Sequence, residues 1–259
     1  MEKIAAPMKE LLSISVVSHR QMALISELMQ DIHENCSNLN IELILTLNLS
    51  EDLVLHAQDF FFPVKVIKNL APKGFGANHN QAFKQACGQH FCVVNPDIRF
   101  DSDPFSLLLS QMKDPAVGVI APLVVGITGE LEDSARRFPT PAIILAKVLG
   151  HGRVSDYSLV TREIEPDWVG GMFMLFPRQV FEQLHGFDER YFLYYEDVDL
   201  CGRLQLAGYK VRVCPQAQVV HHAQRSSHRS LKYLRWHLAS MMRFFLSPVY
   251  RQLKKQKQQ

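Results

Sequence analysis

The sequence predicts an α/β protein with a mostly parallel β-sheet flanked by helices and a helical segment at the C-terminal end. Short apolar stretches alternate with stretches of helical spacing through the first half of the 259-residue chain, an order typical of parallel sheets with helices on both faces. Polar residues follow each of the first four expected strands. Hydrophobic residues make up 47% of the chain and charged residues 21%, which is sufficient for a sizeable core.

The expected elements follow one another along the chain with short connections. Strands are predicted at Leu12–Val17, Ile41–Leu47, Val64–Ile67, Phe91–Val94 and Val117–Ala121. Helices are predicted at Gln21–Asn35, Phe75–Ala86 and Pro104–Met112. The polar region Gly126–Thr140 has no clear period and predicts a loop or hairpin, and Gly152–Asp167 predicts a linker back into the sheet.

The stretch Trp168–Arg203 is the most distinctive part of the sequence. The apolar run Met172–Phe176 predicts a buried strand. The pair Gly170-Gly171 stands just before it, where a ligand or another backbone segment could approach closely. Arg178–His185 then has helical spacing, and Gly186 marks the end of that helix.

Three carboxylates, Glu196, Asp197 and Asp199, open the next predicted helix, Asp197–Ala207. A helix N-terminus stabilises negative charge, and an ionised carboxylate that faces a cleft can remove a proton from a hydroxyl group. The simpler interpretation is that the acids only cap the helix, with Asp199 paired to Arg203. The residue pattern alone leaves both interpretations open.

A second polar stretch, Asn69–Asn80, follows the third expected strand and leads into a helix. Gly74 and Gly76 would allow the backbone to come close to a ligand. Lys73 and the helix N-terminus favour a diphosphate. An ordinary loop with a glycine turn is the alternative for this stretch.

Three segments together carry a resemblance to a known family. They are Gly170-Gly171-Met172-Phe173, Gly186-Phe187-Asp188-Glu189, and Tyr195-Glu196-Asp197-Val198-Asp199-Leu200 with Arg203. Matched spacing across about thirty positions is more specific than a single short motif. The pattern resembles that of family 2 glycosyltransferases, which are inverting enzymes of the Rossmann-like GT-A fold. The resemblance covers about residues 12–246 and implies the transfer of a sugar from a nucleotide-sugar to an acceptor hydroxyl.

The resemblance also implies roles for the matching residues. Asp197 would be the general base, with Glu196 beside it in the catalytic pair. The residues implied to bind the acceptor are Gly170, Gly171, Asp188 and Asp199. The residues implied to bind the donor are Ser18, His19, Asn48, Lys73, Gly74, Gly76, Asn80, Asn95 and Asp97. The Asn-Pro-Asp and Gly-Phe-Asp-Glu forms most resemble bacterial rhamnosyltransferases, which implies dTDP-L-rhamnose as donor and a glycan or lipid-linked acceptor in polysaccharide biosynthesis.

A divalent metal cofactor, Mg²⁺ or Mn²⁺, belongs to the same resemblance. Asp97 stands where the family carries an Asp-x-Asp motif, and hard oxygen ligands suit these ions. His221 would complete the metal site, with His222 as the alternative. The literal Asp-x-Asp, Asp101-Ser102-Asp103, is interpreted instead as a helix start, because Asp103 precedes Pro104 as an N-cap residue would.

Three positions depart from the family pattern. Asn48 replaces the usual Asp after the second strand, His19-Arg20 replaces Tyr-Asn, and Asn95 replaces the first Asp of the metal motif. These departures favour one alternative, a non-catalytic nucleotide-sugar-binding protein on a GT-A fold, although the intact Glu196-Asp197 pair argues against it. A nucleotidyltransferase is a further alternative, but it would usually need a glycine-rich basic loop after the first strand.

Charge and cysteine usage indicate the setting of the protein. Residues 200–259 hold 12 Lys and Arg and no Asp or Glu, whereas residues 1–199 hold 16 Lys and Arg against 26 Asp and Glu. A basic end predicts an anionic partner, such as phosphates, nucleic acid or a membrane surface; without a nucleic-acid-binding module, nucleic acid is not expected. Five cysteines without a CxxC motif, and a start without an apolar signal sequence, predict a reduced cytoplasmic protein, with peripheral contact at the inner face of the cell membrane as an option.

We expect a domain at residues 1–228, with a donor half at about 12–122 and an acceptor half at about 167–228, followed by an amphipathic helix and basic tail at 229–259. The helix would place Leu231, Leu234, Leu238, Met241, Met242 and Phe245 on one face. That face would either pack on the domain or lie in a membrane interface. Lys254, Lys255 and Lys257 are predicted to lie beyond the last helix, so a chain ending at Pro248 should keep its activity and lose membrane binding.

Overall fold

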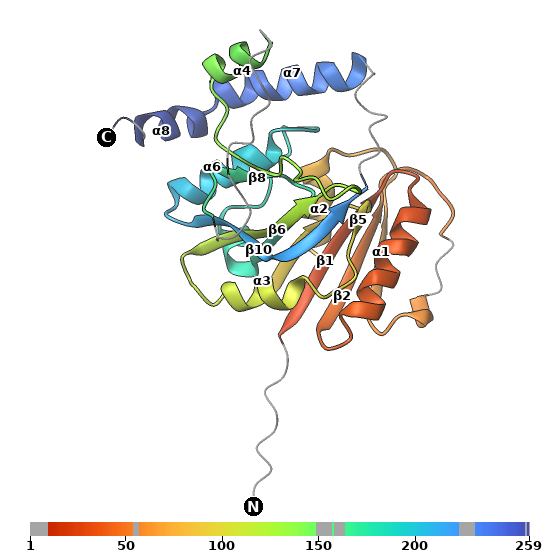
Figure 1. Ribbon diagram of the computed structural model, residues 1–259. Coiled ribbons are helices and arrows are strands. Elements are labelled where there is room, and N and C mark those ends of the chain that lie inside the picture. Colours follow the sequence, from red (N-terminus) through yellow and green to blue (C-terminus); the bar gives the residue numbers. More distant parts are fainter. Residues whose placement is uncertain are drawn as a thin grey trace, which may run out of the picture.

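The computed structural model describes residues 10–53, 57–148, 157, 164–222, 231–256 and 258. Its strands are β1 (Leu11–Ser18), β2 (Asn40–Leu47), β3 (Val64–Lys68), β4 (His90–Val94), β5 (Ile98–Arg99), β6 (Val117–Val125), β7 (Ala135–Arg136), β8 (Trp168–Val169), β9 (Phe173–Pro177) and β10 (Lys210–His221). In this described part they form an eight-stranded sheet in the order β3-β2-β1-β4-β9-β6-β10-β5 and a two-stranded sheet, β7-β8 (Figure 1). The strands predicted from apolar runs are all confirmed, and β6 is longer than expected.

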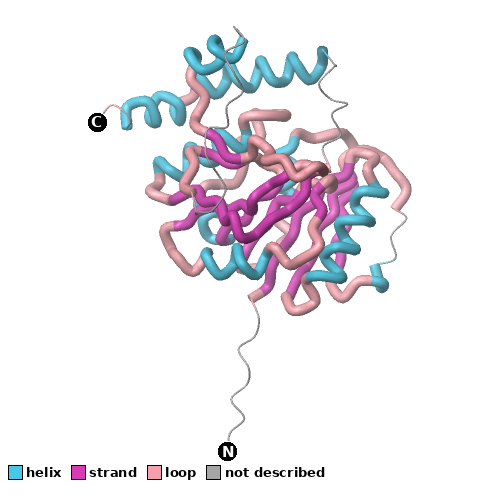
Figure 2. Tube along the Cα trace, in the orientation of Figure 1, coloured by secondary structure: helices cyan, strands magenta, loops and turns pink. Residues whose placement is uncertain are grey.

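The helices are α1 (Met22–Asn35), the 3-10 turn η1 (Ala57–Asp59), α2 (Phe75–Phe83), α3 (Phe105–Gln111), α4 (Pro141–Val148), α5 (Arg178–Gln183), α6 (Glu196–Leu206), α7 (Leu231–Leu246) and α8 (Pro248–Gln256). Helices cover both faces of the sheet (Figure 2). One apolar cluster includes Ile25 of α1 and Leu108 of α3. A second, on the opposite face, includes Phe181 of α5 and Leu200 of α6. The predicted α/β layering is therefore confirmed.

Two strands, β5 and β9, run antiparallel to their neighbours. Both bring distant parts of the chain to the C-terminal end of β4. β9 lies between β4 and β6 and pairs Val94 with Phe173. The segment before β9 therefore lies beside the C-terminal end of β4, and the Asn95 N–H donates to the Met172 carbonyl at 2.9 Å. β5 pairs Ile98 with His221 at the end of β10. Both pairings converge on the turn Asn95–Asp97.

The literal Asp-x-Asp motif is a helix start, as predicted. Asp103 Oδ1 accepts hydrogen bonds from the backbone N–H groups of Phe105 and Ser106, at 2.8 and 3.1 Å. These N–H groups belong to the first turn of α3, so the Asp103 side chain caps this helix. Asp101 is exposed.

The C-terminal helices pack on the domain through only part of the predicted face. Phe244 of α7 and Leu253 of α8 are buried in a third apolar cluster with Tyr191, Tyr195 and Val198. Of the predicted face, Met241 and Phe245 pack against this cluster, whereas Leu234 and Leu238 are exposed. None of the described helices combines the length and the apolar content that crossing a bilayer requires.

The prediction about the tail lysines is also wrong where the structure describes them. Lys254 and Lys255 lie within α8, and Lys257 lies outside the described residues. α8 rests on α6 at Gly202, where an added Cβ would come within 3.0 Å of Val249 and Leu253. A chain ending at Pro248 would uncover the helix that begins with Glu196 and Asp197, so we do not expect that truncation to be neutral.

The region 126–140 forms a hairpin-like loop, as expected, since Val125 bridges to Leu131 and β7 follows. The predicted linker 152–167 falls mostly outside the described residues. So does the predicted boundary at 228–229, and the domain division therefore stays a prediction.

Candidate active site

Asp197 lies at the N-terminal end of α6, facing the glycine pair. Its Oδ2 accepts a hydrogen bond from the Gly171 N–H at 3.0 Å, and its Oδ1 accepts one from the Val198 N–H at 2.8 Å. The residue as a whole is half-buried. Burial raises the pKa of Asp197 above its ordinary value, although the backbone hydrogen bonds and the charge of Arg136 oppose that rise. Asp197 is therefore a carboxylate with a raised pKa that two backbone N–H groups hold in place.

Glu196 differs from its neighbour because its side chain is buried. Its Oε2 atom is buried without a hydrogen-bond partner among the described residues. Burial, together with the nearby charge of Asp197, raises the pKa of Glu196 far above its ordinary value. Burial thus raises the pKa of both adjacent carboxylates, and the charge of Asp197 adds to the rise at Glu196.

The two residues before this pair have an unusual backbone conformation. Tyr194 and Tyr195 have φ values of 70° and 68°, in the left-handed region that non-glycine residues rarely adopt. Such strain persists only where packing imposes it, and it is frequent at functional sites. Here the Tyr195 ring packs against Phe244 and His237 of α7, with centroid distances of 5.7 and 5.5 Å. The C-terminal helix therefore helps to hold the turn that presents Asp197.

Asp199 and Asp188, both predicted to bind the acceptor, are paired with arginines. Asp199 is buried, and Arg203 donates to its Oδ2 at 2.8 Å while also donating to the backbone carbonyls of Leu184 and Gly186. Asp188 binds Arg190 through both carboxylate oxygens. The simpler interpretation of Asp199 as the partner of Arg203 is thus confirmed.

Three glycines of the predicted site lie where another segment of the protein approaches the backbone closely. An added Cβ at Gly74 would lie 2.6 Å from the backbone oxygen of Phe192, and one at Gly76 would lie 2.5 Å from Phe187 Cβ. At Gly171 it would lie 3.0 Å from Phe75 Cζ. These positions lack side chains because α2, the 187–192 segment and the glycine pair pack against one another. The sequence indicated the close approach, and the structure shows protein segments as the neighbours; the ligand contacts expected at these glycines stay a prediction.

Asn48 is buried at the centre of a hydrogen-bond network. This network holds the loop 69–74 between β3 and α2, called the donor loop here because the sequence predicts donor contacts there. Its Oδ1 accepts from the N–H of Lys73 and the amide of Asn69, both at 2.8 Å. Its Nδ2 donates to the Lys73 carbonyl at 2.9 Å and contacts His19 Nε2 at 2.7 Å. An aspartate in this place could not donate to that carbonyl, which gives a physical reason for the departure from the family pattern.

Two other predicted donor contacts have structural partners. Ser18 is buried, and its Oγ accepts from the Gln21 N–H at 3.1 Å. Asn80 binds the backbone of Phe187 through both ends of its amide, at 2.8 and 2.9 Å. Both side chains position loops of the site, whereas His19 lies at the surface with its ring partly enclosed and its Nε2 in contact with the Asn48 amide. Burial lowers the pKa of His19, although Glu51 opposes that shift.

Asp97 and His221 meet at the end of β10, as the metal prediction requires. His221 Nε2 lies 3.4 Å from Asp97 Oδ2, and Glu132 lies 4.0 Å from the other ring nitrogen. Burial acts to lower the pKa of His221, but the hydrogen bond and charge of Asp97, with Glu132, raise it overall. Sequence reasoning missed Glu132, which follows the buried strand β6 and was assigned only to a polar loop. The neighbouring His222 contributes its backbone N–H to the Asp97 carbonyl at 2.8 Å.

These residues fit a divalent cation in part. Asp97 Oδ1 and His221 Nδ1 are buried polar atoms without partners in the described structure, and a carboxylate with an imidazole suits Mn²⁺. No group of three or more His, Cys, Asp or Glu ligands is formed by the described residues. Ions of this kind often complete their coordination with substrate phosphates and water, so two protein ligands and a diphosphate would suffice.

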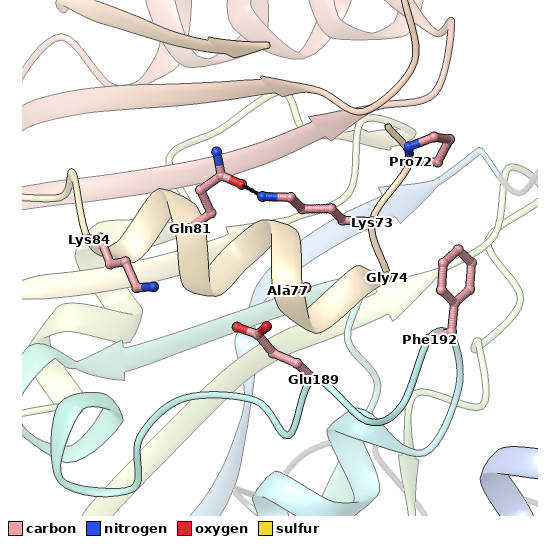
Figure 3. Close-up of a pocket in the computed structure, with 8 residues that line it drawn as sticks. All are labelled: Pro72, Lys73, Gly74, Ala77, Gln81, Lys84, Glu189 and Phe192. Carbon is pink, nitrogen blue, oxygen red and sulfur yellow. Dashed lines mark hydrogen bonds between the residues drawn. The ribbon is translucent and has the colours of Figure 1, made fainter. Parts of the chain in front are cut away.

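A hollow of about 380 Å³ adjoins the donor loop (Figure 3). It is lined by Pro72, Lys73, Gly74, Ala77, Gln81, Lys84, Glu189 and Phe192. Lys73 extends along α2 and donates to Gln81 (Figure 3). The lining includes neither Asp97 nor Asp197, so this hollow is a groove beside the site.

A six-strand parallel framework with an inserted antiparallel β9, a carboxylate pair at a helix start and an Asp–His pair at the sheet edge define a GT-A glycosyltransferase. The chain belongs to glycosyl transferase family 2, whose model matches residues 13–184. A model described as the N-terminal domain of galactosyltransferase matches residues 160–229. The family and the enzyme class predicted from the motifs are confirmed.

Two curated relatives are rhamnosyltransferases by name. Rhamnosyltransferase WbbL of Escherichia coli (strain K12) is 31% identical over 184 residues, which cover 66% of this chain and 69% of that protein. An N-acetylglucosaminyl-diphospho-decaprenol L-rhamnosyltransferase of Mycobacterium tuberculosis is 35% identical over 149 residues, covering 53% of this chain and 48% of that protein. The match thus spans about half the length of the mycobacterial relative.

Solved structures share the fold at low sequence identity. GalNAc-T7 with UDP, GalNAc and Mn²⁺ has a TM-score of 0.67 and 15% identity over 93% of this chain and 48% of that chain. The mannosyltransferase PcManGT from Pyrobaculum calidifontis, in complex with GDP-Man and Mn²⁺, has a TM-score of 0.62 and 18% identity over 92% of this chain and 65% of that chain. These likenesses confirm the predicted GT-A fold.

Proposed function

We propose that this protein transfers L-rhamnose from dTDP-L-rhamnose to a glycan or lipid-linked acceptor in bacterial cell-surface polysaccharide synthesis, with inversion at the anomeric carbon. The observation that carries the chemistry is Asp197, a carboxylate whose pKa is raised by burial and which accepts a hydrogen bond from the Gly171 N–H. The names of the two curated relatives support the choice of sugar. The proposed location is the cytoplasm, with contact at the inner face of the cell membrane.

The proposed reaction is a single displacement. Asp197 takes the proton of the acceptor hydroxyl, and the hydroxyl oxygen forms a bond to the anomeric carbon. The bond between that carbon and the diphosphate oxygen breaks at the same time, and the nucleoside diphosphate leaves with the electron pair. The backbone N–H groups of Gly171 and Val198 hold the Asp197 carboxylate in one orientation throughout.

Asp97 and His221 are the residues that would hold a divalent metal. When bound, such an ion neutralises negative charge on a departing diphosphate as a Lewis acid. Lys73, at the end of the loop that Asn48 organises, contributes a further positive charge on the donor side. Gly170 and Gly171 lie where donor and acceptor would meet, while Asn95 adds a neutral oxygen near Asp97.

A panel of nucleotide-sugars in thermal unfolding, with and without Mn²⁺, tests the donor assignment. A ligand that binds only the folded state raises the melting temperature. We expect dTDP-L-rhamnose with Mn²⁺ to give the largest rise, and release of dTDP when an acceptor is added. A larger rise and faster turnover with a UDP- or GDP-sugar would refute the choice of donor but not the enzyme class.

One observation favours the alternative, a non-catalytic nucleotide-sugar-binding protein. Asn95 stands in the place of a metal-binding Asp and offers only a neutral oxygen. This alternative predicts stabilisation by the nucleotide-sugar without release of the nucleoside diphosphate in the presence of any acceptor.

A further inference from the structure

Helix α7 presents an apolar stripe to solvent. Leu231, Leu234, Leu238, Met242 and Leu246 recur at helical spacing, and their side chains are 46–79% exposed. The opposite side of the helix packs on the domain through Ser240 and Phe244. A surface helix usually turns its apolar side to the core and its polar side to water. Here an apolar stripe faces solvent as well, and within the part of the chain that the structure describes this face is left uncovered.

The positive charges beside the stripe indicate which kind of partner it binds. At 100° per residue, Lys232, Arg235 and Arg243 lie along one side of it. Lys232 lies over the Trp236 ring, 4.7 Å from its centroid, and together with Arg235 and Ala239 these two residues line a hollow of about 320 Å³. No acidic residue follows Asp199 in the sequence. A second copy of this chain would bring cations against cations, whereas an anionic lipid surface complements both the leucines and the charges.

The position of α7 links this face to the active site. Ser240 Oγ donates to the Leu193 carbonyl at 2.9 Å. The Trp236 ring stacks on Phe192 with centroids 4.6 Å apart, and His237 packs against Tyr194 at 5.3 Å. These contacts fall on the segment that leads directly into Glu196 and Asp197. In Figure 1, α4, which carries the exposed Leu145, is drawn at the same end of the molecule as α7.

We propose that α7 is a membrane-docking helix that lies parallel to an anionic bilayer. Its leucine stripe enters the interface, and Lys232, Arg235 and Arg243 bind headgroup phosphates. Because α7 packs on the segment before Asp197, docking sets the active site at a fixed height above the bilayer. The docking itself does not depend on which sugar or acceptor the enzyme uses.

Vesicle sedimentation with the full-length protein tests this inference. The test variant is Leu234→Gln with Leu238→Gln, and the matched control is Leu107→Gln with Ile127→Gln, two exposed apolar residues outside α7. We expect the test variant to bind phosphatidylglycerol-containing vesicles at least tenfold more weakly, because the two leucines are each about half exposed and together remove about one full leucine side chain from water, which contributes about tenfold or more. The control should bind as the parent protein does.

A second pair of variants separates α7 from α8. Arg235→Gln with Arg243→Gln should weaken binding by about fivefold for each charge at low salt, and much less at high salt. Lys254→Gln with Lys255→Gln, on α8, should have a smaller effect. Equal binding to phosphatidylcholine vesicles, or unchanged binding by both α7 variants, would overturn the proposal.

Two further readouts distinguish docking from other roles of the stripe. The leucine variant should keep the parent rate on a water-soluble acceptor analogue, since its side chains point away from the domain. Loss of that rate with unchanged vesicle binding would overturn the proposal and assign the stripe to the site. Self-association in sedimentation velocity that the leucine variant abolishes would also overturn it and make the stripe an interface between copies.

Discussion

Replacing Asp197 by Asn tests the assignment of Asp197 as the general base. The hydrogen bonds of its carboxylate determine how much stability the variant should lose. The carboxylate accepts from Gly171 and Val198 through separate oxygens. Asparagine has one carbonyl oxygen, so one of these N–H groups loses its acceptor, at a cost of about 1–3 kcal/mol. Removing a charge that burial disfavours offsets part of this cost. Against a typical domain stability of about 5–15 kcal/mol, the variant should remain folded.

The catalytic effect should be larger than the structural one. General-base catalysis contributes about 10²- to 10⁴-fold, which corresponds to about 2.7–5.4 kcal/mol of transition-state stabilisation. Initial rates of nucleoside diphosphate release measure this effect, and the thermal shift with the nucleotide-sugar checks that the donor still binds. Asp101→Asn, at an exposed carboxylate, is the matched control. A rate for Asp197→Asn within an order of magnitude of the parent rate would exclude Asp197 as the base.

Other outcomes follow from the same geometry. Burial raises the pKa of Asp197 while Arg136 lowers it, so kcat/KM should fall as the pH drops through a value above the ordinary aspartate range. Arg136→Ala should move this acidic side of the pH profile to higher pH. An unchanged profile would show that the charge of Arg136 does not act on the base. Asp97→Ala should abolish the Mn²⁺-dependent part of the rise in melting temperature that the nucleotide-sugar causes, whereas Asp101→Ala should retain it. The reverse result would show that the literal Asp-x-Asp binds the metal. Asn48→Asp removes the donor to the Lys73 carbonyl and should cost about 1–3 kcal/mol in urea unfolding, with weaker donor binding; an equally stable variant would contradict the role of this amide in holding the loop.

Periodicity and motif spacing were sufficient to predict the layered fold. A strand such as Phe91–Val94 is buried on both faces and is therefore a continuous apolar run, which sequence shows directly. The cap at Asp103 and the pairing of Asp199 with Arg203 also depend on residues close in sequence. The family assignment rested on motifs whose spacing is likewise local.

Only the tertiary structure decided which partners the site residues have. The glycines at positions 74 and 76 indicated close approach, but the approaching segment, 187–192, is more than a hundred residues away along the chain. Glu132 comes near His221 because β10 lies beside β6, a pairing that no local pattern specifies. The leucine spacing of α7 predicted an amphipathic helix, yet spacing does not determine which side faces the domain. That choice depends on segment 191–195, where the Leu193 carbonyl accepts from Ser240 and the Tyr195 ring packs on Phe244, while the leucines stay exposed.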